Sequence, residues 1–85
     1  MQQHMTADDI RNTIRASVSR ITGIAAAEIQ DASHFRDDLG LDSLSILELT
    51  VDLEYAFKIK VPEDRLQSLR TVNDAIQLIQ EFIPA

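Results

Sequence analysis

The chain has 85 residues, with 14 acidic and 8 basic side chains, a formal net charge of −6 and no cysteine. This length suits a single domain with one modest core, and a chain without cysteine has no disulfide, no thiolate zinc site and no cysteine nucleophile. The acidic excess is concentrated, because residues 21–57 contain eight carboxylates and one basic side chain, Arg36. Such a chain lacks the basic surface that binds nucleic acids and anionic membranes, so we expect neither as a partner.

Residues 1–5 form a polar lead-in that we expect to be flexible, and residues 6–85 form a single domain. The lead-in lacks the basic and then apolar pattern of a secretory signal peptide, and no segment approaches the roughly 18 apolar residues of a membrane span. Since the chain also has no cysteine, we expect a cytoplasmic protein, and we expect it to be a monomer.

Apolar residues recur at helical spacing in four segments, which predicts helices over about 6–22, 43–58, 62–69 and 72–83. Thr6 and Asp9 are spaced like a capping box at the start of the first helix, and Thr71 and Asp74 repeat that spacing at the last. Pro62 suits the first turn of the short third helix. No segment alternates like a strand, so the sequence predicts an all-α four-helix bundle with a long loop between helices 1 and 2.

The long loop, residues 23–42, shows neither a helical nor a strand period. Loops of that length without structure are uncommon in small domains, so we expect this one to be functional or to contain a short helical turn. Its isolated apolar residues, Ile24, Ile29 and Phe35, are the candidates for anchoring it to the core.

The second predicted helix is capped by Asp42 and has apolar residues on two sides. One side is an ordinary core stripe made of Ile46, Leu49, Thr50, Leu53 and Phe57. About 100° or more around the helix lies a second apolar group, flanked by acids. It consists of Leu44, Leu47 and Val51, with Glu48, Asp52 and Glu54 around them. Either the loop or the third helix covers this second face, or it is open to a partner with apolar and basic groups.

Ser43 is the first residue of that predicted helix, next to backbone N–H groups that have no helical partner. A negative charge placed on its hydroxyl would be favoured by the helix dipole, so phosphoryl modification suits the position. A serine at this position is also common as a simple capping residue, and the position alone does not separate the two roles.

The segment Leu39–Leu44 surrounds this serine and reads L-G-x-D-S-L. The pattern continues in the second helix with Glu48-Leu49 and Leu53-Glu54. Supporting positions elsewhere are Phe35, Val61-Pro62 and Thr71-Val72. With these motifs the chain resembles the acyl carrier protein family, over about residues 7–83.

That resemblance implies a carrier that is not itself an enzyme and to which a separate phosphopantetheinyl transferase attaches 4′-phosphopantetheine from coenzyme A. Ser43 would receive the group through a phosphodiester, with Asp42 and Leu44 beside it as cofactor-binding residues. The thiol of the arm would carry acyl intermediates of fatty acid or polyketide-type biosynthesis as thioesters. We expect no catalytic residue and no metal ligand in the chain itself.

The resemblance also implies a docking face for enzymes that present basic patches. The expected partners are the transferase, an acyltransferase, a ketosynthase and other acyl-processing enzymes. The residues expected on this face are Leu44, Leu47, Glu48, Val51, Asp52, Glu54 and Asp38.

Some residues depart from the pattern of fatty acid carriers, namely Leu41, which is bulky, Tyr55, which replaces a frequent acid, Lys58 and Lys60. The pathway therefore stays open between fatty acid, polyketide and other secondary biosynthesis. Two alternatives remain beside it: a peptidyl or aryl carrier of nonribosomal synthesis, and an unmodified helical interaction module. We expect a freestanding carrier, since the chain starts with Met and stops just after its last predicted helix.

Overall fold

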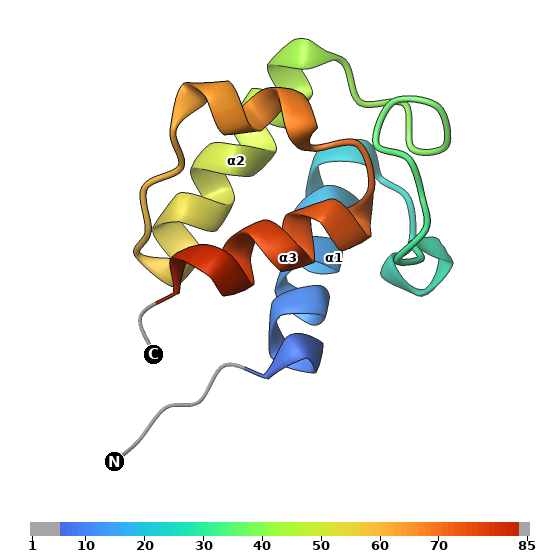
Figure 1. The fold of residues 1–85 in the computed structure, drawn as a ribbon. Helices are drawn as coiled ribbons and strands as arrows, with labels where there is room; N and C mark the ends of the chain where they lie inside the picture. The colour runs from blue at the N-terminus through green and yellow to red at the C-terminus, as the bar shows by residue number, and fades with distance from the viewer. Residues whose placement is uncertain (1–5, 84–85) are drawn as a thin grey trace.

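The computed structural model describes residues 6–83 and contains three α-helices and two short 3-10 helices. In chain order they are α1 (Ala7–Thr22), η1 (Ala26–Glu28), α2 (Ser43–Phe57), η2 (Glu63–Ser68) and α3 (Val72–Phe82). Figure 1 shows the three α-helices meeting at the centre of the molecule, with η2, in orange, alongside α2. The predicted all-α bundle, with its long loop and short third helix, is confirmed. Within residues 6–83 no helix is long and apolar enough to cross a bilayer.

Two helices begin at the capping boxes that the sequence predicts. Thr6 Oγ1 accepts a hydrogen bond from the Asp9 N–H at 3.1 Å, and the Asp9 carboxylate accepts one from the Thr6 N–H at 3.1 Å. Thr71 and Asp74 make the same reciprocal pair at the start of α3. Each box satisfies two of the N–H groups that a helix start leaves unpaired, which fixes where α1 and α3 begin.

The core lies where the three α-helices meet. From α1 it takes Ile10, Ile14 and Val18. From α2 it takes the predicted stripe, Ile46, Leu49, Thr50, Leu53 and Phe57. From α3 it takes Val72, Ala75, Ile76, Leu78 and Ile79. The buried hydroxyl of Thr50 donates to the Ile46 carbonyl at 2.9 Å, so this polar group enters the core without an unpaired donor.

The long loop is anchored to the core and to the start of α3. Ile29 and Phe35 are completely buried, as the sequence predicts, and the expected helical turn is η1. The Phe35 N–H donates to the Arg70 carbonyl at 2.9 Å, and an isolated β-bridge pairs His34 with Thr71. These contacts hold the loop in place on both sides, so the segment that leads into α2 has a defined path.

Just before α2 the chain turns at Gly40, whose φ of +72° lies in the left-handed region that favours glycine. Leu39 and Leu41, on either side of this turn, are both buried. Leu41, one of the departures from the fatty acid carrier pattern, is therefore a core residue and does not alter the exposed surface.

The ends of three helices differ from the predicted ones. Pro62 is the N-cap of η2, with extended backbone, and lies outside its first turn. This third helix is a 3-10 helix of six residues that contains no buried residue, so packing does not impose a longer α-helix. Lys58 adopts a left-handed conformation with φ 56°, which ends α2 at Phe57. The last helix ends at Phe82, and the predicted lead-in, residues 1–5, lies outside the described residues.

η2 is tied to the rest of the fold by an ion pair, an arginine–aromatic contact and one half-buried side chain. Arg65 Nη2 lies 2.6 Å from Glu81 Oε2, and its guanidinium carbon lies 5.5 Å from the centre of the Phe82 ring. The hydrogen bonds from Arg65 lower the pKa of Glu81, which keeps that carboxylate ionised. Leu66 adds a partly buried apolar contact with the core.

Candidate functional site

Ser43 is exposed and is the first residue of α2, as predicted. Asp42 is the N-cap of this helix, and its Oδ1 accepts a hydrogen bond from the Ser45 N–H at 2.8 Å. This hydrogen bond from the Ser45 backbone lowers the pKa of Asp42, because it favours the charged carboxylate. The predicted cap is confirmed. The serine hydroxyl is thus held at the positive end of a helix beside an ionised carboxylate.

Arg36 is a candidate residue that the sequence reasoning missed. Its Nη2 donates to Ser43 Oγ at 2.7 Å, although the two residues are seven positions apart and the loop between them turns at Gly40. A signal was present in the sequence, because Arg36 is the only basic side chain between residues 21 and 57. Its contact with the serine depends on the path of the loop, which periodicity does not predict.

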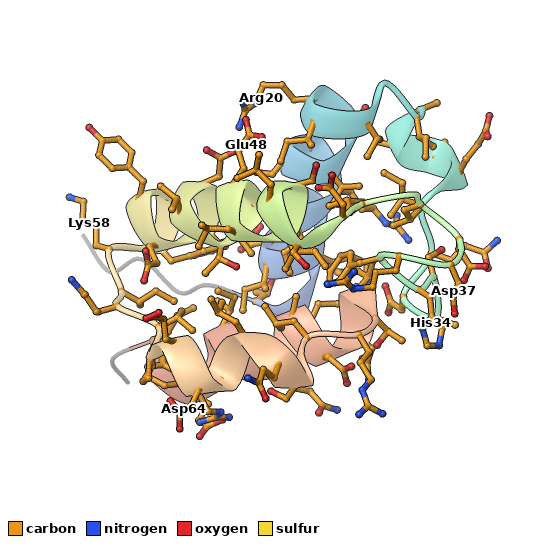
Figure 2. The ribbon with its side chains drawn as sticks, turned by 90° about the horizontal axis from the view of Figure 1, so that it is seen from above. Arg20, His34, Asp37, Glu48, Lys58 and Asp64 are labelled. Carbon is orange, nitrogen blue, oxygen red and sulfur yellow. The ribbon has the colours of Figure 1, made fainter. Side chains whose placement is uncertain are left out.

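A groove of about 630 Å³ opens beside Ser43, between α2 and η2. Its apolar lining consists of Ile46, Leu47, Leu66 and Leu69. Its polar lining consists of Ser43, His34, Arg36, Asp37, Glu63, Gln67 and Arg70. Figure 2 shows His34 and Asp37 at the end of α2 where the loop enters, and Lys58 at the opposite end. The groove therefore joins an apolar interior to a polar region that contains the serine.

The second apolar face of α2 is exposed in the structure. Leu44, Leu47, Val51 and Tyr55 have exposed fractions of 73%, 46%, 53% and 88%, and we call these four residues the outer face. Neither the loop nor η2 covers it, so the alternative of a covered second face is wrong. Leu47 belongs both to this face and to the lining of the groove.

Two acids predicted for docking lie beside the outer face in different states. Glu48 is exposed, and no hydrogen bond or ion pair within residues 6–83 involves its side chain. Asp52 forms an ion pair with Arg20 of α1. Figure 2 shows Glu48 and Arg20 on one side of the molecule and Asp64, on η2, on the other. Arg20 therefore adds a positive charge beside the acidic residues of α2.

The other two predicted docking acids also make structural hydrogen bonds. Glu54 Oε2 accepts from the Val61 N–H at 2.7 Å, which ties the end of α2 to the segment before η2. Asp38 Oδ2 accepts from the His34 N–H at 2.7 Å and thereby closes a turn of the loop. Both carboxylates therefore stabilise local backbone. Of the four acids predicted for docking, Glu48 alone makes no hydrogen bond or ion pair within residues 6–83.

The fold and this serine define a small helical domain with an exposed hydroxyl at the start of its central helix. A family model described as a phosphopantetheine attachment site matches residues 12–79. The chain belongs to this phosphopantetheine-binding family of acyl carrier proteins, which confirms the resemblance seen in its motifs.

Named relatives agree with this assignment. The meromycolate extension acyl carrier proteins of Mycobacterium leprae and Mycobacterium tuberculosis are each 38% identical over 78 residues, covering 92% of this chain and 68% of theirs. A solution structure of an apo doublet acyl carrier protein from prodigiosin biosynthesis matches 99% of this chain with a TM-score of 0.79 and 24% identity. This chain spans 43% of that one, and the likeness concerns the fold.

The cofactor of this family is 4′-phosphopantetheine, held covalently, as the sequence predicts. The region around Ser43 fits such a group in three respects. The hydroxyl is exposed, a guanidinium lies 2.7 Å from it, and a groove opens next to it. An anion attached here would meet both the helix dipole and the charge of Arg36.

Proposed function

We propose that Ser43 is the attachment site and that the loaded chain carries acyl groups between enzymes. The observation that carries this proposal is the exposed Ser43 hydroxyl, at the first position of α2 and beside the groove. When bound, the arm supplies a thiol that holds acyl groups as thioesters, which a chain with no cysteine does not supply itself. The protein then acts as a covalently modified cosubstrate.

The loading step conserves atoms and charge in a simple displacement. Ser43 Oγ forms a bond to the coenzyme A phosphorus that bears pantetheine, and the bond from that phosphorus to the bridging oxygen of the pyrophosphate breaks. Adenosine 3′,5′-bisphosphate leaves, and the hydroxyl proton passes to a base of the transferase. Asp42 holds the helix start through Ser45 and adds negative charge that attracts a cation of the transferase. Leu44, the next residue, offers an exposed apolar contact to the same enzyme.

Docking is assigned to the outer face together with the acids around it. Four exposed apolar side chains provide contact area, and Glu48 provides a carboxylate that steers a basic partner. Asp38, Asp52 and Glu54 contribute charge at the rim while they also hold the fold. The partners are the transferase and acyl-processing enzymes, such as an acyltransferase or a ketosynthase, with basic patches.

The cargo is assigned to acyl chains of lipid or polyketide-type biosynthesis. Relatives at 38% identity are named for meromycolate extension, which supports a lipid-type acyl cargo. The apolar lining of the groove, from Ile46, Leu47, Leu66 and Leu69, supports a cargo with an alkyl segment.

Mass spectrometry tests the attachment site directly. Incubation with coenzyme A and a broad-specificity transferase should add the mass of one phosphopantetheine group to the wild-type chain. Ser43→Ala should gain no mass and should keep its helical circular dichroism, because Ser43 is exposed and Asp42 caps the helix. Ser68→Ala, which changes an exposed serine of η2 outside the site, is the control and should load.

Two outcomes would overturn this assignment. One is a wild-type chain whose mass stays constant under conditions that load a known carrier. The other is a Ser43→Ala variant that still gains the group, which would place the attachment at another residue.

A further inference from the structure

Arg36 is the basic side chain of an otherwise acidic segment, and it points at the serine. Its guanidinium donates to Ser43 Oγ at 2.7 Å, and the Arg36 side chain also lines the groove between α2 and η2. None of the ion pairs within residues 6–83 includes it, and its charge acts at longer range on the Asp42 carboxylate, whose pKa it helps to lower. The observation that needs an explanation is a cation without a contacting carboxylate that makes a hydrogen bond to the hydroxyl proposed to carry the phosphodiester.

We propose that Arg36 binds the phosphodiester of the attached arm and fixes the orientation of the phosphate at the start of the arm. This inference rests on the proposed attachment at Ser43. After modification, Ser43 Oγ becomes an ester oxygen, which is a poor acceptor, while the two non-bridging oxygens of the phosphodiester, which share one negative charge, lie two bonds beyond it. A guanidinium presents parallel N–H groups that match such a pair of oxygens, so the existing contact becomes a stronger, charge-assisted one.

The side on which Arg36 lies gives the arm a direction. Arg36 approaches Ser43 from the groove, whereas Leu44 and Val51 of the outer face are exposed on another side of α2. The phosphorus of the diester is tetrahedral, so when its two non-bridging oxygens pair with Arg36, the oxygen that leads to pantetheine lies on the side away from the guanidinium. Arg36 therefore fixes the orientation of the phosphate and with it the direction in which the arm leaves Ser43.

The backbone of Arg36 has a separate structural role that a side-chain substitution preserves. Its carbonyl accepts a hydrogen bond from the Gly40 N–H at 3.2 Å, and its side chain is exposed. Arg36→Ala should therefore fold normally. Arg70→Ala is the matched control, because Arg70 is an exposed arginine of the same groove lining that makes no side-chain contact with Ser43.

Phosphorus NMR of the holo protein tests the inference. Wild type and Arg70→Ala should share one phosphodiester resonance position, and Arg36→Ala should shift it toward that of free phosphopantetheine. Loading should also raise the melting temperature of wild type and Arg70→Ala, and Arg36→Ala should lose roughly half or more of that rise. Arg36→Lys keeps the charge and loses the paired N–H groups, so its phosphorus shift and its rise in melting temperature should lie between those of wild type and Arg36→Ala.

A second measurement uses wild type alone and does not depend on loading a variant. The Arg36 Nε–H resonance in nitrogen-15 spectra should move, and its exchange with water should slow, when the apo protein is converted to the holo form. An unchanged Arg36 resonance, or an Arg36→Ala phosphorus spectrum identical to that of wild type, overturns the role of Arg36 while the attachment at Ser43 stands. A wild-type chain that gains no mass overturns both.

Discussion

The helices α2 and α3 pack against the same core but differ in what they expose. Each buries five residues, and α3 leaves no large apolar side chain exposed. By contrast, all of the large exposed apolar side chains among residues 6–83, Leu44, Leu47, Val51 and Tyr55, lie on α2. The fold needs only the inner stripe of each helix, which supports the docking role proposed for the second apolar face of α2.

The largest expected effect tests whether the two faces of α2 differ in this way. Leu49 is fully buried, and Leu49→Ala should lower the free energy of unfolding by about 2–5 kcal/mol. Val51, two residues further along α2 on the outer face, is the control. Val51→Ala should change the free energy of unfolding by no more than about 0.5 kcal/mol. Urea denaturation of both variants measures the contrast. Equal losses would mean that the outer face contributes to the core.

A charge reversal tests whether the outer face is a docking surface. Glu48→Lys should weaken the interaction with the transferase by about threefold to tenfold, because it removes an attractive charge and adds a repulsive one. The effect should shrink at high salt, because surface charges are screened. Kinetics of loading at several salt concentrations measure it as a rise in KM.

Asp64→Lys provides the matched control for this prediction. It makes the same change in charge on η2, on the side of the molecule opposite Glu48 in Figure 2. Its KM should stay close to that of wild type. If both variants lose affinity equally, then total charge and not the face of α2 determines docking.

A smaller effect is expected for Asp31, an acid that stabilises the fold and is not predicted to contact a partner. Arg11 Nε donates to Asp31 Oδ1 at 2.8 Å, and this hydrogen bond holds the pKa of Asp31 below its ordinary value. A lowered folded-state pKa contributes stability above the unfolded pKa, which is lost as the pH falls through the folded one. Because the Asp31 side chain is 38% exposed, Asp31→Asn should cost less than about 1 kcal/mol at pH 7.

The pH dependence of that loss is its distinguishing feature. The difference in unfolding free energy between wild type and Asp31→Asn should shrink below about pH 4, where the aspartate of the unfolded chain becomes protonated. Urea denaturation at pH 7 and at acid pH measures it. A difference that stays constant or grows in acid would show that Asp31 acts through packing and not through its charge.

The smallest expected effect concerns Tyr55 at the far end of the outer face. With 88% of Tyr55 exposed, Tyr55→Glu should change the free energy of unfolding by less than about 0.5 kcal/mol. It should make docking more sensitive to salt, because it adds a carboxylate to the face. Denaturation and salt-dependent loading kinetics measure the two parts, and a large loss of stability would mean that the ring packs against the fold.

Local signals in the sequence predicted the helix starts and the inner faces well. Thr6 and Thr71 lie three residues before an acid, and a capping box depends only on that spacing. Asp42 before an apolar period predicted the start of α2, and that start positions Ser43. The two faces of α2 followed from the helical repeat alone.

The remaining features depend on contacts between distant segments. The hydrogen bond from Arg36 to Ser43 requires the turn at Gly40, and the bond from Val61 to Glu54 requires the chain to fold back after α2. The spacing of apolar residues does not predict such contacts, because they depend on how a loop folds back onto a helix. η2 is a 3-10 helix because it packs weakly against the core, and the spacing of its apolar residues does not predict how deeply they are buried.

The two walls of the groove differ in how firmly they are held. The wall formed by α2 is backed by five buried residues, whereas η2 contains none and is tied by the Arg65–Glu81 pair and by half-buried Leu66. An ion pair at the surface is weak, so displacing η2 costs less free energy than displacing α2. Under the proposed function, the room for an acyl chain in the groove depends on the position of this six-residue helix, while the three α-helices form a constant frame.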